Sequence, residues 1–171
     1  ITNKLGIGTV SPAVQLHLSS SAANNFRLER SGASNAAIHF KNASEDWYAG
    51  ITSTANFSIS RNADLSAGTE FVIRGNTGRV GIGTSNPDNE LHVTDGSAGS
   101  VSANSNTQFT VESGGHAGIQ FLSPNSSNNI IYFGDVDDND VGYVAYQHGS
   151  NIFNIVVNTT EAMFIDGGNG Q

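Results

Sequence analysis

A glycine-containing pattern occurs twice in the sequence and limits the folds that this chain can adopt. The copies span residues 4–18 (KLGIGTVSPAVQLHL) and 79–93 (RVGIGTSNPDNELHV). Each alternates apolar residues with glycine, passes through a proline turn and resumes the alternation in LHL or LHV. Alternation is typical of a β-strand, and glycine inside a strand marks a bulge or the close approach of another backbone. The pattern therefore predicts a repeat protein built from strands.

Short runs with a strand period fill the rest of the chain. They are rich in Phe and β-branched residues, and Ser, Asn and Gly separate them. No helical period is sustained, so the sequence predicts an all-β chain. The expected strands are Asn25–Arg30, Ala36–Lys41, Trp47–Thr52, Ala55–Arg61, Thr69–Arg74, Gln108–Glu112, Ala117–Leu122, Asn129–Gly134, Gly142–Gln147, Asn151–Asn158 and Glu161–Asp166.

Matching motifs divide the chain into two units. Apolar residues hold their places while the residues between them drift, as expected of strands with an inward and an outward face. The matches are 26–29 with 109–112, 37–40 with 118–121, 57–59 with 153–155 and 72–75 with 164–167. We expect unit 1 over residues 1–78 (neck 4–18, β-body 25–78) and unit 2 over 79–171 (neck 79–93, β-body 108–171). The second unit ends where another glycine pattern would begin, which suggests a segment of a longer array.

The composition favours a chain that does not bury its core alone. Charged residues make up 13% of the sequence, about half of the usual share of roughly 25%. Two units of this size have thin cores by surface-to-volume scaling. We therefore expect oligomerisation to supply further burial.

The distribution of charge argues against two classes of partner. All 7 Lys and Arg residues lie at or before Arg79, and only acidic charges follow it. A half without cations lacks the phosphate contacts that dominate nucleic-acid affinity, and an anionic membrane surface would repel it. The sequence has no cysteine, and it contains no G-x-S-x-G elbow, phosphate loop or HExxH motif. We expect no enzyme activity and no cofactor.

Several motifs together resemble a known family. VGIGT followed by a proline turn and LHV is similar to the recurring segment of bacteriophage tail-fibre proteins and related trimeric fibre adhesins. In the second unit the resemblance extends to 132–135, 137–143, 146–148 and 161–166. It implies an elongated, parallel homotrimeric β-fibre of antiparallel sheets with glycine-rich necks, located extracellularly on a virion tail and involved in host attachment. Neighbouring fibre repeats would be its other partners. The neck residues would be Gly6, Ile7, Gly8, Gly81, Ile82 and Gly83, with glycines that let three backbones approach and isoleucines that fill the axis.

Other functions stay open at this stage. Trp47, Tyr48, Tyr143 and Tyr146 could stack on sugar rings of a host-surface glycan in a carbohydrate-binding module, but aromatic residues of a small β-protein more often fill the core or an interface, which is the favoured interpretation. A tailspike glycosidase fragment is a third hypothesis, which the short repeating units argue against. A structural shaft needs no catalytic residue, and we favour it.

Two groups of residues are candidate metal ligands. Asp135, Asp137 and Asn139 place oxygen atoms at alternate positions, like the start of a calcium loop. Position 6 is not Gly and position 12 is not Glu, so a turn in which Asp and Asn bond their own backbone is the favoured interpretation. His17 and His92 occupy equivalent positions and could form a metal-binding ring in a trimer. Alternation favours exposed or rim histidines instead.

Overall fold

The computed structural model describes residues 4–21, 26–65 and 69–168, and within these ranges it contains strands and no helix. The all-β prediction is confirmed, and most strand pairs are antiparallel. The chain forms two compact units, Ile1–Ala117 and Gly118–Gln171. No helix that could cross a membrane occurs in the described part of the chain.

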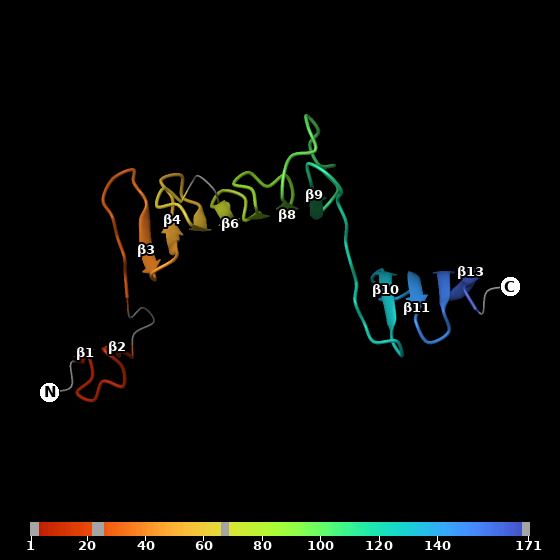
Figure 1. The fold of residues 1–171 in the computed structure, drawn as a ribbon, viewed down its shortest axis with the longest axis horizontal. Helices are drawn as coiled ribbons and strands as arrows, with labels where there is room; N and C mark the ends of the chain where they lie inside the picture. Colours follow the sequence, from red (N-terminus) through yellow and green to blue (C-terminus); the bar gives the residue numbers. More distant parts are fainter. Residues whose placement is uncertain (1–3, 22–25, 66–68, 169–171) are drawn as a thin grey trace. The chain divides into compact units, whose positions relative to one another are not determined.

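The first unit contains two sheets (Figure 1). The smaller pairs β1 (Leu5–Ile7) with β2 (Leu16–Leu18) in parallel. The larger has seven strands in sequence order, antiparallel from β3 to β7 and parallel from β7 to β9. Its strands are β3 (Ala36–Lys41), β4 (Asp46–Ile51), β5 (Phe57–Ser60), β6 (Thr69–Ile73), β7 (Val80–Ile82), β8 (Leu91–Thr94) and β9 (Phe109–Glu112).

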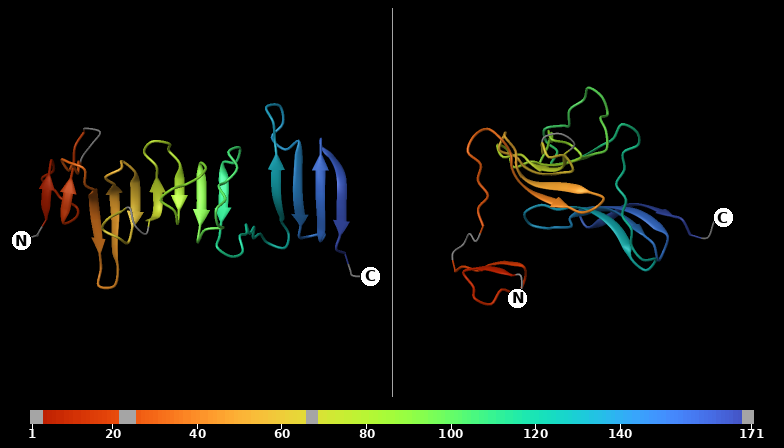
Figure 2. Two further views of the ribbon diagram at one scale, coloured as in Figure 1. Left: turned by 90° about the horizontal axis from the view of Figure 1, so that it is seen from above. Right: turned by 60° about the vertical axis from the view of Figure 1, so that its left-hand side comes forward.

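The second unit is one antiparallel sheet. Its strands are β10 (Asn128–Phe133), β11 (Gly142–Gln147), β12 (Ile152–Val157) and β13 (Thr160–Asp166). They follow the order of the sequence, as the left view of Figure 2 shows; a longer loop joins β10 to β11, and short turns join β11 to β12 and β12 to β13.

Both glycine patterns form the same local structure. In each, the strand before the proline turn pairs in parallel with the strand after it, with Leu5 opposite Leu16 and Val80 opposite Leu91. Antiparallel pairing was expected throughout, and it is wrong for these segments. The turn carries the chain back over the sheet, so the second strand starts at the same end as the first. We call these two segments, residues 4–19 and 79–94, the glycine coils.

The strands β3–β6 and β10–β13 are structural counterparts. Ile59 lies opposite Phe71 and Ile155 lies opposite Met163, and a bulge follows directly after Ile59 and after Ile155. The register makes β10 the counterpart of β3, because Phe40 lies opposite Trp47 as Phe133 lies opposite Gly142. We call each set of four strands a β-module.

This register corrects two predictions about strands. The match of residues 37–40 with 118–121 is wrong, since residues 117–122 form no strand. Residues 26–30 form none either, and Asn25 lies outside the described residues. Alternation shows which side chains can share a face, but only a neighbouring strand turns such a segment into part of a sheet. The expected boundary between residues 78 and 79 separates β6 from β7, which pair within one sheet.

Candidate functional site

One face of the seven-stranded sheet is apolar and open. Residues opposite one another in a sheet share a face, so the register identifies its members. The large exposed side chains among these members are between 36% exposed, at Trp47, and 56% exposed, at Phe40. We call this surface the apolar face: it comprises Ile38, Phe40, Trp47, Ile51, Phe57, Ile59, Phe71, Ile73, Val80, Ile82, Leu91, Val93, Phe109 and Val111.

The opposite face of the same sheet carries mostly small and polar side chains, yet over β5–β8 it is the buried one, whereas at β3 it stays open, with His39 and Lys41 exposed. Ser58 is 1% exposed, Ser60 is 0% exposed and Val72 is 1% exposed. Turns of the unit gather along this side, as Figure 1 shows, and Leu65 from the β5–β6 connection is fully buried there. Within the first unit, the described strands contact only their neighbours in the sheet, so no second strand layer of this unit covers the apolar face. Over β5–β8 the usual arrangement, with apolar side chains inside, is therefore reversed.

The sheet of the second unit repeats this surface. Ile131, Phe133, Met163 and Ile165 hold the positions that Ile38, Phe40, Phe71 and Ile73 hold in the first unit. The four are between 46% and 57% exposed. Both β-modules therefore present the same uncovered apolar surface.

The exposed area of the chain shows how much burial is missing. The chain exposes 12453 Å². Two separate globular bodies with the sizes of the two units would together expose about 9,500 Å², or about 3,000 Å² less. Obligate complexes bury roughly 2,000–5,000 Å² per interface. Those areas are summed over both partners. The excess of this one chain is thus of the size that two neighbouring chains would cover in a permanent assembly.

The neck glycines fit tightly against their own chain. A Cβ atom on Gly83 would lie 2.0 Å from the carbonyl oxygen of Thr94, and one on Gly81 would lie 2.3 Å from that of Thr84. Gly8 and Gly6 have equivalent contacts at 1.9 and 2.5 Å, and Gly8 and Gly83 have φ near +77°. These contacts account for the glycines without a sister chain. Ile7 and Ile82 lie on the other side of their strands, 56% and 43% exposed.

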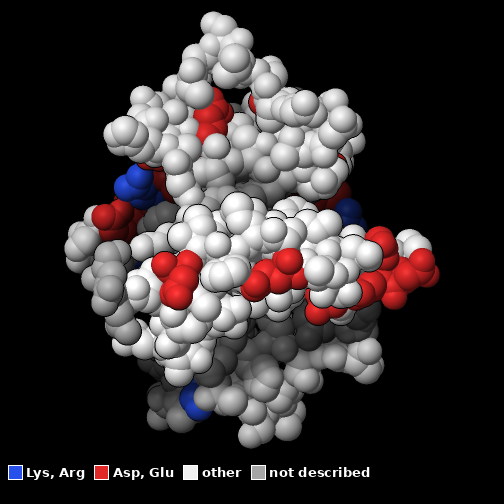
Figure 3. Space-filling view, turned by 90° about the vertical axis from the view of Figure 1, so that its right-hand side faces the viewer, with Lys and Arg blue, Asp and Glu red and all other residues white. Residues whose placement is uncertain are grey.

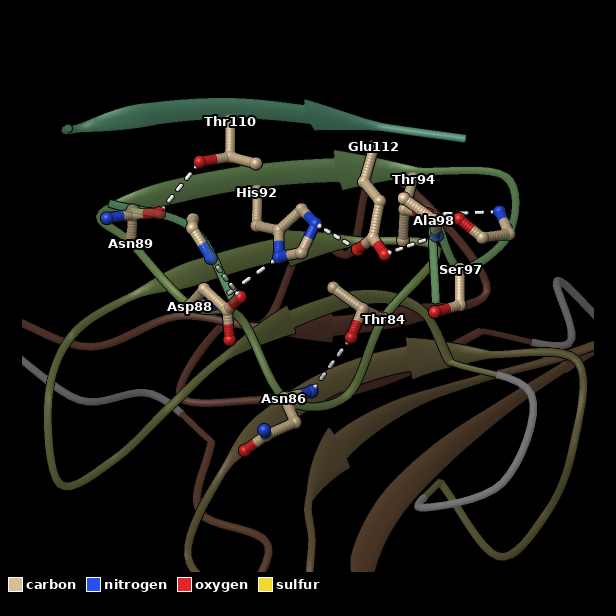
Figure 4. A network of polar contacts seen from close by, with 12 residues as sticks. Thr84, Asn86, Asp88, Asn89, His92, Thr94, Ser97, Ala98, Thr110 and Glu112 are labelled. Atoms are coloured by element: carbon tan, nitrogen blue, oxygen red, sulfur yellow. Dashed lines mark hydrogen bonds and ion pairs between the residues drawn. The ribbon is translucent and has the colours of Figure 1, made fainter. Parts of the chain in front are cut away.

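The second glycine coil contains a buried histidine, His92 (Figure 4). His92 is 4% exposed, so the expectation of an exposed or rim histidine is wrong there. Its Nδ1 accepts the backbone N–H of Asp88 at 3.3 Å, which assigns the ring proton to Nε2. Nε2 lies 3.0 Å from Oε2 of Glu112, without the direction of a hydrogen bond. His17 accepts the N–H of Ala13 in the same way at 3.2 Å.

Polar side chains around His92 hold the connection from β8 to β9. Glu112 accepts the N–H of Ala98 at 2.7 Å, and Asp88 accepts the N–H of Ala103 at 2.9 Å. Asn89, which is 4% exposed, donates to the carbonyl oxygens of the same connection. An open hollow of about 610 Å³ lies beside these groups. Figure 4 shows the carboxylates turned toward backbone amides, and this arrangement serves to position the connection.

The connection from β10 to β11 contains the candidate calcium ligands. Its residues 135–140, which we call the acidic loop, form the kind of turn that the sequence favours. Oδ1 of Asp135 accepts the N–H groups of Asp137 and Asp138, both at 2.9 Å, and these bonds lower the pKa of Asp135. The Asp138 carboxylate raises the pKa of Asp140, because it accepts a hydrogen bond from the protonated Asp140 carboxyl and repels its ionised form. Asn139 contributes no side-chain bond among those found in the described part of the loop.

The corresponding turn of the first unit shows the same geometry without that charge. Oδ1 of Asn42 accepts the N–H groups of Ser44 and Glu45, both at 2.8 Å. Asn42 is the counterpart of Asp135 in the register of the β-modules. The side chain at this position therefore needs an oxygen acceptor and does not need an ion.

Within each unit, the two aromatic candidates lie on opposite faces of the sheet. Trp47 lies on the apolar face, whereas Tyr48 lies on the opposite face and stacks on His39 with ring centroids 4.3 Å apart. Tyr143 contacts Tyr132 edge to face, and the Tyr146 hydroxyl bonds to Asn151. Sequence reasoning found the aromatic residues but not their faces, which depend on strand register.

Comparisons with known proteins leave the family open. No family model and no curated protein matches the chain. Among the described residues, no group of three His, Asp or Glu side chains is arranged to hold a metal ion.

Proposed function

We propose that this chain is a structural segment of a trimeric bacteriophage tail fibre, located on the virion and involved in host attachment. The observation that carries the proposal is the apolar face of the first unit together with its counterpart on the sheet of the second unit. No described strand of the same unit covers either surface. Three copies that turn these faces toward a common axis would bury them in a shared core. The motif resemblance supplies the number three and the viral setting.

Isoleucines supply the contacts of this assembly in the neck. Ile7 and Ile82 lie on the open side of the glycine coils, while Gly6 and Gly81 face the chain's own turns. Sister chains would therefore pack through side chains in the necks, and the glycines would shape each chain before it assembles. Burial of exposed apolar surface contributes roughly 25 cal/mol per Å², so an interface of this size supplies stability that the thin units lack.

The proposed trimer and a carbohydrate-binding role would both require the side chain of Trp47. This side chain is part of the apolar face, so a trimer of this kind would cover it and remove it from solvent. A glycan-binding site on the assembled fibre would have to use other residues. No observation gathers such residues, and the shaft role is the better supported proposal.

Sedimentation equilibrium tests the proposal. The chain is expected to sediment at three times its mass of 17.8 kDa at micromolar concentration. Ile82→Lys places a charge in the middle of the apolar face and should shift the equilibrium toward monomer, because a buried unpaired charge is costly. Asn76→Lys adds the same charge in an exposed turn and should leave the mass unchanged. A folded monomer of the unaltered chain would contradict the proposal.

A further inference from the structure

An apolar hollow lies on the sheet of the second unit, at the end where β11 begins. Gly142 lies between Phe133 of β10 and Val157 of β12 in the register, so the three residues share one face of that sheet. Together with Ile155 they line an open hollow of about 410 Å³. The side chains of Phe133 and Val157 are both exposed. The hollow therefore belongs to the uncovered apolar surface of this β-module.

The first unit fills the corresponding place with a side chain of its own. Trp47 is the counterpart of Gly142, because each lies opposite the phenylalanine of the first strand in its β-module. A tryptophan ring thus stands in one module where the other has no side chain. The hollow exists because of this single difference.

The other end of the same strand shows the opposite difference. Trp47 is followed by Ile51 on the same face of β4. Gly142 is followed by Tyr146 at the same spacing on β11. The second unit thus lacks an aromatic ring near the start of the strand and carries one near its end. These positions lie about 13 Å apart within a chain, at roughly 3.3 Å per residue, so they do not touch. A contact between two chains accounts for the paired change.

The ring of Tyr146 is held in place at the end of its strand. Its hydroxyl donates to Oδ1 of Asn151 in the turn after β11, and the Asn151 amide donates to the Gly167 oxygen at 3.0 Å. The ring also meets His148 edge to face, with centroids 5.0 Å apart. In the corresponding turn of the first unit, Ala55 has the same positive φ and no side-chain oxygen. The ring and its support therefore occur together, in the module that has the hollow.

We propose that Tyr146 of one chain docks in the hollow over Gly142 of the next chain. This inference rests on the proposed trimer and names one of its contacts. Three sheets that turn their apolar faces toward an axis, with strands crosswise to it, form a triangle around that axis. Each corner brings the start of a strand beside the end of the same strand in the next chain. Such a contact joins two different patches, so three copies close into a ring.

Charge and area favour a second copy as the occupant. The described residues around the hollow are uncharged, and residues 118–171 contain acidic residues but no Lys or Arg. Figure 3 faces the side on which β13 ends and shows acidic groups within a broad uncharged surface. An anionic partner would be repelled, and a cation would lose its hydration over apolar side chains. A neutral ring avoids both costs, and the uncovered area of the chain is already of the size that neighbouring chains would cover.

A double-mutant cycle tests the contact, with assembly measured by sedimentation equilibrium. Gly142→Trp fills the hollow and should raise the concentration of half-assembly about tenfold, because the docked ring loses its space. Tyr146→Ile alone leaves the hollow empty and should also weaken assembly. The two changes together copy the pair of the first unit. They should return assembly to within about threefold of the unaltered chain, which is far from additive.

Strain within one chain cancels in this cycle. A Cβ on Gly142 would lie 3.2 Å from the Val156 oxygen, so the tryptophan strains its own strand equally with Tyr or Ile at position 146. Tyr143→Ile is the matched control. Tyr143 lies on the same strand but on the opposite face, so this change should not rescue Gly142→Trp.

The reverse exchange in the first unit is a second cycle, which serves if Gly142→Trp fails to fold. Trp47→Gly and Ile51→Tyr should each weaken assembly alone and restore it together. Additive effects in either cycle, or an equal rescue by Tyr143→Ile, would overturn the contact while the unaltered chain is still a trimer. A folded monomer of the unaltered chain would overturn the trimer and the contact together.

Discussion

The two glycine coils have the same backbone and different surroundings. Gly8 and Gly83 have φ of 77° and 78°, and His17 and His92 each accept a backbone N–H at 3.2–3.3 Å. His92 is nevertheless 4% exposed, whereas His17 is half-buried. The second coil lies between β6 and β9, whereas no described strand lies at either outer edge of the first. Local sequence thus sets the backbone of the coil, and neighbouring strands set its burial.

Gly83→Val should have the largest effect on this comparison. Valine is strained at positive φ, and its Cβ would meet the Thr94 oxygen at 2.0 Å, so we expect a loss of about 2–4 kcal/mol in unfolding free energy. Gly8→Val meets the same clash but disrupts only the two-stranded sheet, so we expect a smaller loss of unfolding free energy. Urea unfolding of both variants measures the difference. Equal losses would mean that the first coil is as well supported as the second.

His92→Leu should have an intermediate effect. It leaves the part-buried N–H of Asp88 without an acceptor and removes the ring nitrogen beside Glu112, which costs about 1–3 kcal/mol. His17→Leu should cost less, because water can reach the N–H of Ala13 beside a half-buried ring. The same unfolding experiment applies. A larger loss for His17→Leu would contradict the burial that distinguishes the two coils.

The smallest effect concerns the turns that join the first two strands of each β-module. Two backbone N–H groups lower the pKa of Asp135 below its ordinary value of 3.8. The stability that they contribute is present above pH 3.8 and is lost as the pH falls through the lower folded pKa. Asp135→Asn copies Asn42, so it should keep the turn and remove this acid dependence.

The carboxyl group of Asp140 contributes to stability with the opposite pH dependence. The pKa of Asp140 is raised, so its contribution is present below pH 3.8 and is lost as the pH rises through the folded pKa. Asp140→Asn is therefore the matched control, and it should make stability less sensitive to pH above 3.8. Acid titrations of thermal stability separate the two variants. An Asp135→Asn chain with the acid dependence of the unaltered chain would show that the turn bonds do not cause it.

The sequence predicted the strands where alternation coincides with a paired neighbour. Ala36–Lys41, Gly142–Gln147 and the two necks lie in sheets. Alternation at 117–122 had no neighbouring strand and formed none. The alternation of Phe57 and Ile59 around Ser58 likewise marked one apolar face, whereas Phe71 and Ile73 flank the apolar Val72 and gave no such contrast. Which face is open was not identifiable, because that depends on turns that return over the polar side.

The glycines of the necks had two explanations in the sequence. A strand glycine can admit a sister backbone or the chain's own backbone, and composition does not distinguish them. The structure shows the Thr84 and Thr94 oxygens at Gly81 and Gly83. The burial of His92 was also unpredictable, because alternation places it on the face opposite the apolar residues. That face is the inner one only because the sheet is reversed.

The central claim is that sister chains cover the apolar face, and Trp47 reports on this directly. It is the only tryptophan in the sequence, lies on that face and is 36% exposed in the single chain. Acrylamide quenching of its fluorescence can be measured across a dilution series, with the mass determined on the same samples. We predict that quenching decreases as the mass rises, and that Ile82→Lys stays accessible throughout. Quenching that stays constant while the chains associate would contradict the claim.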